Sequence, residues 1–195
     1  MYQPTPEQLL EAPAKVLYEW HMFFASLNAC LKLQEKKELD EGKTWTQEDD
    51  DIYNATLEAT LLHARNLYEF FKKRPYRDNI RAAHFLSDPE WTSSKLNLLE
   101  SRQTVINYGL SHLTYRRVSE VKPDWNELRE IADEVNAAFD EFISLIPKNE
   151  QSRWKVARNR QKIYVRDETS VNTHRNFRPP ITTATPNYIL SSKPL

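Results

Sequence analysis

Four stretches of the chain place apolar side chains three and four residues apart, and this spacing puts them on one face of an α-helix. Pro13 suits the opening of the first helix, Pro75 stops the second, and Asp124 caps the fourth. Ser93 or Ser94 is the expected cap of the third helix. The pattern therefore predicts helices over residues 13–42, 52–74, 94–117 and 125–146.

The first 147 residues show no alternating pattern that would indicate a strand, so the expected fold class is all-α, a four-helix bundle. The segment 75–92 has two prolines and no sustained period, which predicts an ordered connection with room for one short helix, held by Phe85 and Trp91. The expected domains are a helical bundle, residues 1–147, and a basic, proline-containing C-terminal extension, residues 148–195, partly extended or disordered.

The composition excludes several functional classes. Gly42 and Gly109 are the only glycines, so the sequence contains neither the three-glycine dinucleotide-binding loop nor the phosphate-binding P-loop. Cys30 is the only cysteine, which rules out an internal disulfide and a CxxC pair. No helix carries an HxxxH or ExxH pair, so we expect no metal and no cofactor. Without a long apolar stretch or a secretory leader, we expect a cytoplasmic protein with no membrane association.

The net charge of −1 conceals two oppositely charged parts: residues 1–146 carry −8 and residues 147–195 carry +7. Six basic and no acidic residues lie between Arg153 and Arg166, interleaved with Trp154 and Tyr164, a composition that could contact phosphates and stack on bases. The same stretch could instead dock on the acidic body, stay solvated or recruit a protein partner. The candidate nucleic-acid-binding residues are Arg153, Lys155, Arg158, Arg160 and Lys162.

Two histidines on neighbouring predicted helices are the strongest candidates for chemistry. His63 lies on the second helix and His112 on the third, and packing of these helices could bring both to one polar pocket for acid and base catalysis. Alternatively, His63 is a hydrogen-bonded residue at the edge of the apolar stripe, or a metal ligand. The candidate catalytic residues are His63, Asn107, His112 and Arg116. The candidate substrate-binding residues, which would hold a phosphate or orient a hydroxyl, are Arg65, Asn66 and Arg117.

The segments LLHARNLYEFF, RDNIRAAHF and INYGLSHLTYRR, together with the helix that starts at Trp125, resemble an uncharacterised bacterial all-helical family over roughly residues 50–146. More distantly, the pattern resembles the HEPN superfamily (higher eukaryotes and prokaryotes nucleotide-binding), whose motif is Arg, four to six residues, then His. With His112 as that histidine, the arginine position falls on Val105, Ile106 or Asn107. None of these supplies the fixed positive charge of an arginine.

The HEPN resemblance implies a homodimer that binds RNA or a nucleotide and acts as a metal-independent endoribonuclease of a defence or toxin–antitoxin type. The competing expectation is a non-catalytic helical-bundle interaction protein that uses its basic tail to bind a partner. A small-molecule enzyme with its site in the bundle core is a third class, although no nucleophile and base stand out as a pair.

Overall fold

The structure is a computed structural model that describes residues 3–39, 44–72, 79–111 and 123–154. These residues form helices joined by turns, with no β-strand among them, so the predicted all-α class is confirmed. The helices are α1 (Pro6–Leu39), α2 (Gln47–Phe71), the short 3-10 helix η1 (Ala82–Phe85), α3 (Asn97–Ser101), α4 (Gln103–Ser111) and α6 (Trp125–Leu145).

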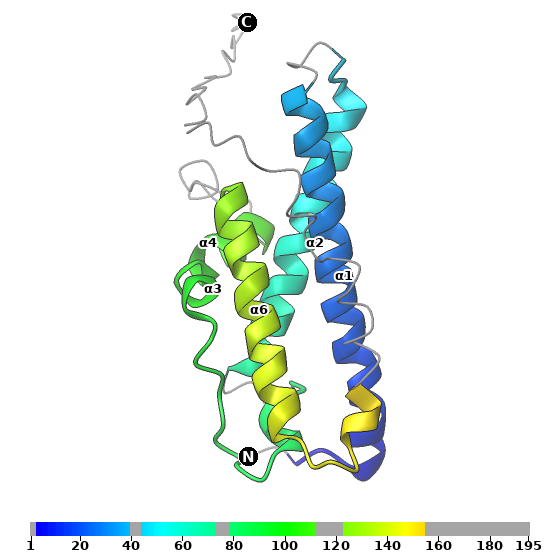
Figure 1. Cartoon of the computed structure of the whole chain (residues 1–195), viewed down its shortest axis with the longest axis vertical. Helices are drawn as coiled ribbons and strands as arrows, with labels where there is room; N and C mark the ends of the chain where they lie inside the picture. Colours follow the sequence, from blue (N-terminus) through cyan, green and yellow to red (C-terminus); the bar gives the residue numbers. More distant parts are fainter. Residues whose placement is uncertain (1–2, 40–43, 73–78, 112–122, 155–195) are drawn as a thin grey trace, which may run out of the picture. The chain divides into compact units, whose positions relative to one another are not determined.

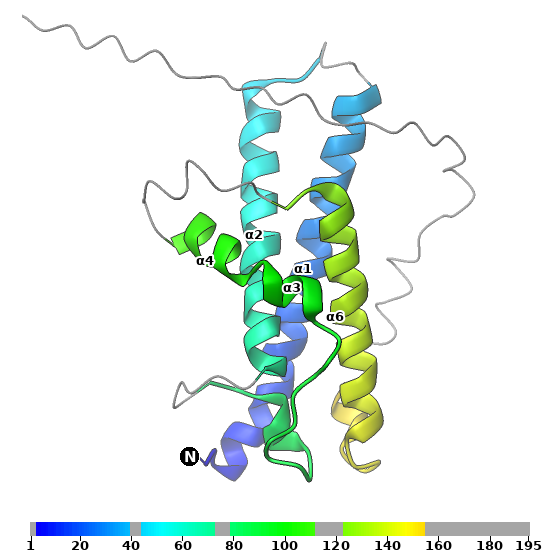
Figure 2. The same cartoon turned by 90° about the vertical axis from the view of Figure 1, so that its left-hand side faces the viewer.

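Helices α1 and α2 form the most extensive pair, lying side by side and antiparallel (Figure 1). Helix α6 packs against both of them, α3 packs against α6, and α4 packs against α2, as the turned view in Figure 2 shows. The apolar faces of these helices meet in one core, which the short helices α3 and α4 complete with Leu99 and Ile106. The described elements thus bury the apolar stripes that the sequence predicted.

Helix α1 begins at Pro6 rather than at Pro13, so that sequence prediction is wrong. The start is fixed by a reciprocal capping box: the Gln8 N–H donates to Thr5 Oγ1 (3.3 Å), and the Thr5 N–H donates to Gln8 Oε1 (2.8 Å). Pro6 then occupies the first helical position, where a missing N–H costs nothing. Pro13 lies inside the helix and is buried, in a helix of 34 residues that is supported along its length by packing against α2.

The single helix predicted over residues 94–117 is also wrong within the described residues, because the chain forms α3 and α4 with a break at Arg102. Helix α3 is capped by tertiary structure: the carboxylate of Glu134 on α6 accepts hydrogen bonds from the N–H groups of Leu98 (2.9 Å) and Leu99 (3.0 Å). At the break, the Arg102 guanidinium pairs with Glu127 of α6. Glu134 and Glu127 both belong to α6. The cap of α3 and the contact at the break therefore depend on a distant helix, and no local sequence pattern could have signalled them.

The predicted start of the fourth helix at Trp125 is confirmed, whereas the second helix begins at Gln47, five residues before the predicted start at residue 52. Each of these two helices begins with a capping box. Thr46 Oγ1 accepts from the Asp49 N–H (3.2 Å) at α2, and Asp124 Oδ1 accepts from the Glu127 N–H (2.9 Å) at α6. The Lys36 ammonium at the end of α1 also donates to Asp49 Oδ1 (2.8 Å). This hydrogen bond, followed by one from the Thr46 backbone, lowers the pKa of Asp49 to about 2.

The connection between α2 and α3 contains η1, the expected short helix, and its residues Phe85 and Trp91 pack on the core as predicted. The core also takes in Trp154, which is 1% exposed and lies 4.9 Å from Phe142 and 5.1 Å from Phe85 between ring centroids. The domain boundary expected after residue 147 stays a prediction, but Trp154 packs with the bundle.

We expect Trp154→Ala to lower the free energy of unfolding by about 3–5 kcal/mol, because it removes a fully buried indole from the aromatic cluster. Urea denaturation followed by far-UV circular dichroism measures this change. Leu145→Ala, which shortens a side chain that is 50% exposed on α6, is the control and should change stability by less than about 1 kcal/mol. Equal effects of the two substitutions would show that Trp154 is not part of the core.

Asp49 should make stability depend on pH in the acid range. Its pKa is lower in the folded protein (about 2) than its ordinary value of 3.8, so its contribution is complete above about pH 4 and is lost as the pH falls towards 2. Asp49→Asn should therefore flatten the stability profile between these values, measured as urea midpoints at successive pH values. Asp51→Asn, which removes a carboxylate from the same end of α2, is the control. Parallel profiles for wild type and Asp49→Asn would contradict the assignment.

Candidate functional site

A polar cluster of Glu19, His63 and Asn66 lies at the seam between α1 and α2. The Glu19 carboxylate reaches from α1, with Oε2 placed 2.6 Å from His63 Nδ1 and 2.9 Å from Asn66 Nδ2 on α2. His63 and Asn66 are three residues apart and share one side of their helix, so one carboxylate oxygen can bind both. The structure thus brings together two of the predicted site residues, around a partner that the sequence analysis did not name.

The contacts of His63 fix its orientation. An ionised carboxylate oxygen can only accept hydrogen bonds, so Nδ1 of His63 donates to Glu19, and Asn66 donates to the same oxygen. The ring of Tyr18 meets the imidazole edge-on, with 6.1 Å between centroids. The His63 side chain retains 11% of its exposure, and its Nε2 has no hydrogen-bond partner among the described residues. A carboxylate that holds Nδ1 in this way leaves Nε2 able to accept a proton.

Arg65 does not join this cluster. Two residues along a helix turn a side chain by about 200°, so Arg65 leaves α2 on a different side from His63. Its Nε donates to Glu69 Oε1 at 3.2 Å, and Asn79 Nδ2 donates to the other oxygen of Glu69 at 3.4 Å. The guanidinium expected to hold a phosphate is therefore already paired with a carboxylate of the same helix.

Asn107 lies on α4, half-buried, and no hydrogen bond within the described part of the chain joins it to Glu19 or His63. Among the described residues, its buried Oδ1 has no hydrogen-bond donor, and neither has Oε1 of Gln103 one turn earlier on the same helix.

The remaining predicted site residues lie outside the described residues, so the meeting of His63 with His112 in one pocket stays a prediction. These residues are His112, Arg116, Arg117, Lys155, Arg158, Arg160 and Lys162.

Arg153 is described, and its guanidinium pairs with Glu150 at 2.7 Å. Its neighbour Trp154 is enclosed by the rings of the core, so the expectation that this indole could stack on a base is wrong.

Glu19 is the functional-site residue that the sequence reasoning missed. On α1 it adjoins the buried positions Val16, Trp20 and Phe23, so it belongs to the border of the apolar stripe. A carboxylate at the border of an apolar stripe usually has a partner, and this was the sequence signal that could have identified Glu19. Its partner could not be identified from sequence, because His63 lies 44 residues away and the contact depends on the alignment of two long helices.

Among the described residues, no group of three or more His, Cys, Asp or Glu side chains could hold a metal ion. None of the helices in that part of the chain has both the length and the apolar character needed to cross a membrane. Comparisons with protein-family models, curated proteins and solved structures found no match to the chain.

A double-mutant cycle tests the Glu19–His63 contact. We expect His63→Ala to lower the free energy of unfolding by about 1–3 kcal/mol, because it leaves a partly buried carboxylate without its main partner. Glu19→Ala should cost a similar amount, and the double variant clearly less than the sum of the two, with a coupling of at least about 0.5 kcal/mol. His21→Ala, at an exposed histidine on α1, is the control. Additive effects of the two substitutions would mean that the contact contributes nothing.

Proposed function

We propose that this protein is a non-catalytic, helical interaction protein whose basic segment, residues 153–166, binds an acidic surface of a protein partner. One observation carries the proposal: each predicted site residue with a basic side chain that the structure describes already faces a carboxylate of its own chain. The pairs are His63 with Glu19, Arg65 with Glu69 and Arg153 with Glu150.

Such pairing is unfavourable for binding a phosphodiester. A phosphate that approached His63 or Arg65 would meet a carboxylate beside each basic side chain, and the repulsion between like charges opposes binding. The same pairs suit a scaffold, because hydrogen-bonded polar groups at the helix borders satisfy one another without an external ligand.

The burial of Trp154 favours a protein partner over single-stranded RNA. Binding of single strands relies on aromatic rings that stack on bases as well as on positive charge. Trp154 is enclosed in the core, so the segment keeps its charge but loses one of its two aromatic rings as a base platform. A positively charged segment with less capacity to stack on bases matches an acidic protein surface. We place the interaction in the cytoplasm, where the buried Cys30 thiol stays reduced.

The competing proposal is a HEPN-like four-helix homodimer that binds RNA or a nucleotide and cleaves RNA without metal. It is favoured by the orientation of His63, because Glu19 holds Nδ1 and leaves Nε2 for proton transfer. In that proposal Asn107, His112 and Arg116 would have to complete the site, either in one chain or across the dimer.

The test measures binding to two labelled polyanions, a glutamate-rich peptide and an oligouridylate of equal length, by fluorescence anisotropy. We expect the peptide to bind more tightly to the full chain, with an affinity that falls as salt rises. Replacing four basic-segment cations by glutamine, at Lys155, Arg158, Arg160 and Lys162, should weaken peptide binding roughly tenfold or more. The matched control replaces four exposed cations of the bundle, at Lys32, Lys95, Arg129 and Lys148, and should retain most of the binding.

Two results would overturn the proposal. Tighter binding of the oligouridylate than of the peptide would make the segment a nucleic-acid interface. Cleavage of RNA in the presence of a chelator, lost in His112→Ala and in His63→Ala, would establish the ribonuclease instead.

A further inference from the structure

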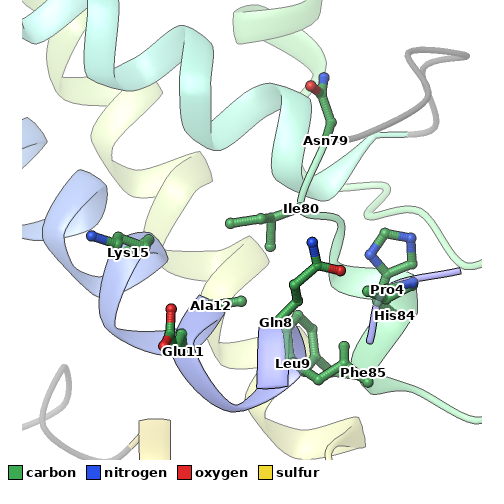
Figure 3. A pocket seen from close by; sticks show the side chains of 10 residues that line it. All are labelled: Pro4, Gln8, Leu9, Glu11, Ala12, Lys15, Asn79, Ile80, His84 and Phe85. Atoms are coloured by element: carbon green, nitrogen blue, oxygen red, sulfur yellow. The ribbon is translucent and has the colours of Figure 1, made fainter. Parts of the chain in front are cut away.

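A pocket of about 200 Å³ lies between the first turns of α1 and residues 79–85 (Figure 3). This volume is below the roughly 300–1,000 Å³ of pockets that bury drug-sized ligands, so the pocket suits a smaller molecule. Its apolar wall is formed by Pro4, Leu9, Ala12, Ile80 and Phe85. Ile80 is 38% exposed although it is a large apolar side chain, so this wall gains free energy when an apolar group covers it.

The uncharged polar side chains of the lining already make hydrogen bonds within the chain. Gln8 Oε1 accepts the backbone N–H of Thr5 at 2.8 Å, and Asn79 Nδ2 donates to Glu69 Oε2 at 3.4 Å. His84 Nδ1 accepts the backbone N–H three residues earlier, at 3.3 Å. Burial lowers the pKa of His84, so its ring is uncharged at neutral pH. These three side chains therefore bring no net charge to the pocket.

The charged residues of the lining are Glu11 and Lys15, both exposed on α1. They are four residues apart with the glutamate first, which is the order that favours an ion pair on a helix. Arg65 and Glu69 on α2 have the same separation and do form an ion pair, at 3.2 Å. Within the described part of the chain, no ion pair or hydrogen bond engages the side chain of Glu11 or of Lys15. Both charges therefore remain accessible to a ligand.

The positions of these groups define the form of a ligand that uses the whole pocket. Glu11 and Lys15 lie at one end and Phe85 at the other, with Ala12 and Ile80 between them (Figure 3). A matching ligand carries a positive and a negative group close together at one end and an apolar group at the other. A free α-amino acid has this form, because its ammonium and its carboxylate are attached to the same carbon atom.

The Lys15 side chain can adapt to such a ligand. Its ammonium points away from the centre of the pocket in Figure 3, while its stem lies along the rim. A lysine ammonium is carried on a flexible four-carbon stem, so an exposed one can turn towards an anion without any change in the helix.

We propose that this pocket binds a free α-amino acid with a large apolar side chain. The ligand's ammonium binds the Glu11 carboxylate, its carboxylate binds the Lys15 ammonium, and its side chain covers Ile80 and Phe85. The apolar contact supplies most of the affinity, because ion pairs between exposed groups are weak, and the two charges select the ligand. This site is additional to the proposed function and does not depend on the basic segment.

Nuclear magnetic resonance of the isotope-labelled full chain, titrated with L-phenylalanine at neutral pH, tests the proposal. We expect the amide signals of Ala12 and Ile80 to shift and to saturate, with a Kd on the order of 1 mM or below. Two analogues each lack one charge: 2-phenylethylamine has no carboxylate and 3-phenylpropionate has no ammonium. Each should bind at least about threefold more weakly than L-phenylalanine. L-Alanine, which keeps both charges but not the ring, should bind at least about tenfold more weakly.

Variants of the two charged residues connect each analogue to one side chain. Glu11→Gln and Lys15→Gln change exposed side chains, and each should weaken L-phenylalanine binding at least about threefold. Glu11→Gln should not weaken binding of 3-phenylpropionate, and Lys15→Gln should not weaken binding of 2-phenylethylamine. The matched controls are Lys32→Gln and Glu35→Gln, at exposed positions of α1 outside the pocket, and both should keep the wild-type affinity.

Three results would overturn the proposal. The first is the absence of saturable shifts at Ala12 and Ile80 with L-phenylalanine. The second is binding of either analogue as tightly as L-phenylalanine, because the pocket would then be a site for a simple amine or a simple acid. The third is wild-type affinity for L-phenylalanine in both Glu11→Gln and Lys15→Gln. The spectra also report whether each variant is folded, so a loss of binding through unfolding is recognised directly.

Discussion

The packing of aromatic rings around Phe142 is the interaction on which the rest of the structure depends. Its ring meets Phe70 and Phe71 of α2, Phe139 of its own helix, and Trp154 from beyond the end of α6. These contacts join segments that are far apart in sequence, and each buried ring contributes a large apolar area. The core around this cluster also contains side chains from α1 and α2 and the ring of Trp154, and Phe85 of η1 packs against it.

Around that core, the polar side chains at the helix borders mostly pair with one another. Glu19 binds His63 and Asn66, and Glu69 binds Arg65 and Asn79. Glu134 caps the start of α3, and Glu127 pairs with Arg102 at the break between α3 and α4. In each case a carboxylate satisfies donors from a different turn or a different helix, which strengthens the bundle and occupies groups that a phosphate would need. The proposal of a non-catalytic interaction protein rests on this arrangement.

The sequence predicted the all-α class correctly, and it located the fourth helix correctly because the local signals there were strong. The apolar stripe of α6 and its Asp124 cap were both evident. Pro13 and the Thr5–Gln8 capping box are both sequence signals for a helix start, and α1 begins at the capping box. For the candidate site, His63 was correctly identified as a polar residue at the border of an apolar stripe, and Asn66 was placed near it. Arg65 and Glu69 are four residues apart on one helix, so their ion pair could also have been predicted from the sequence. Arg65 was instead assigned to phosphate binding.

What the sequence by itself determined is the set of properties that depend on neighbouring residues: helical periodicity, capping, the division of charge and the exclusion of glycine-rich nucleotide loops. Only the tertiary structure decided which helix borders meet, and with them the Glu19–His63 contact, the break at Arg102 and the burial of Trp154. The physical reason is the separation along the sequence over which each kind of interaction acts. Periodicity and caps arise within one or two turns of a helix, whereas these contacts depend on the relative position of whole helices, which the packing of the complete core fixes.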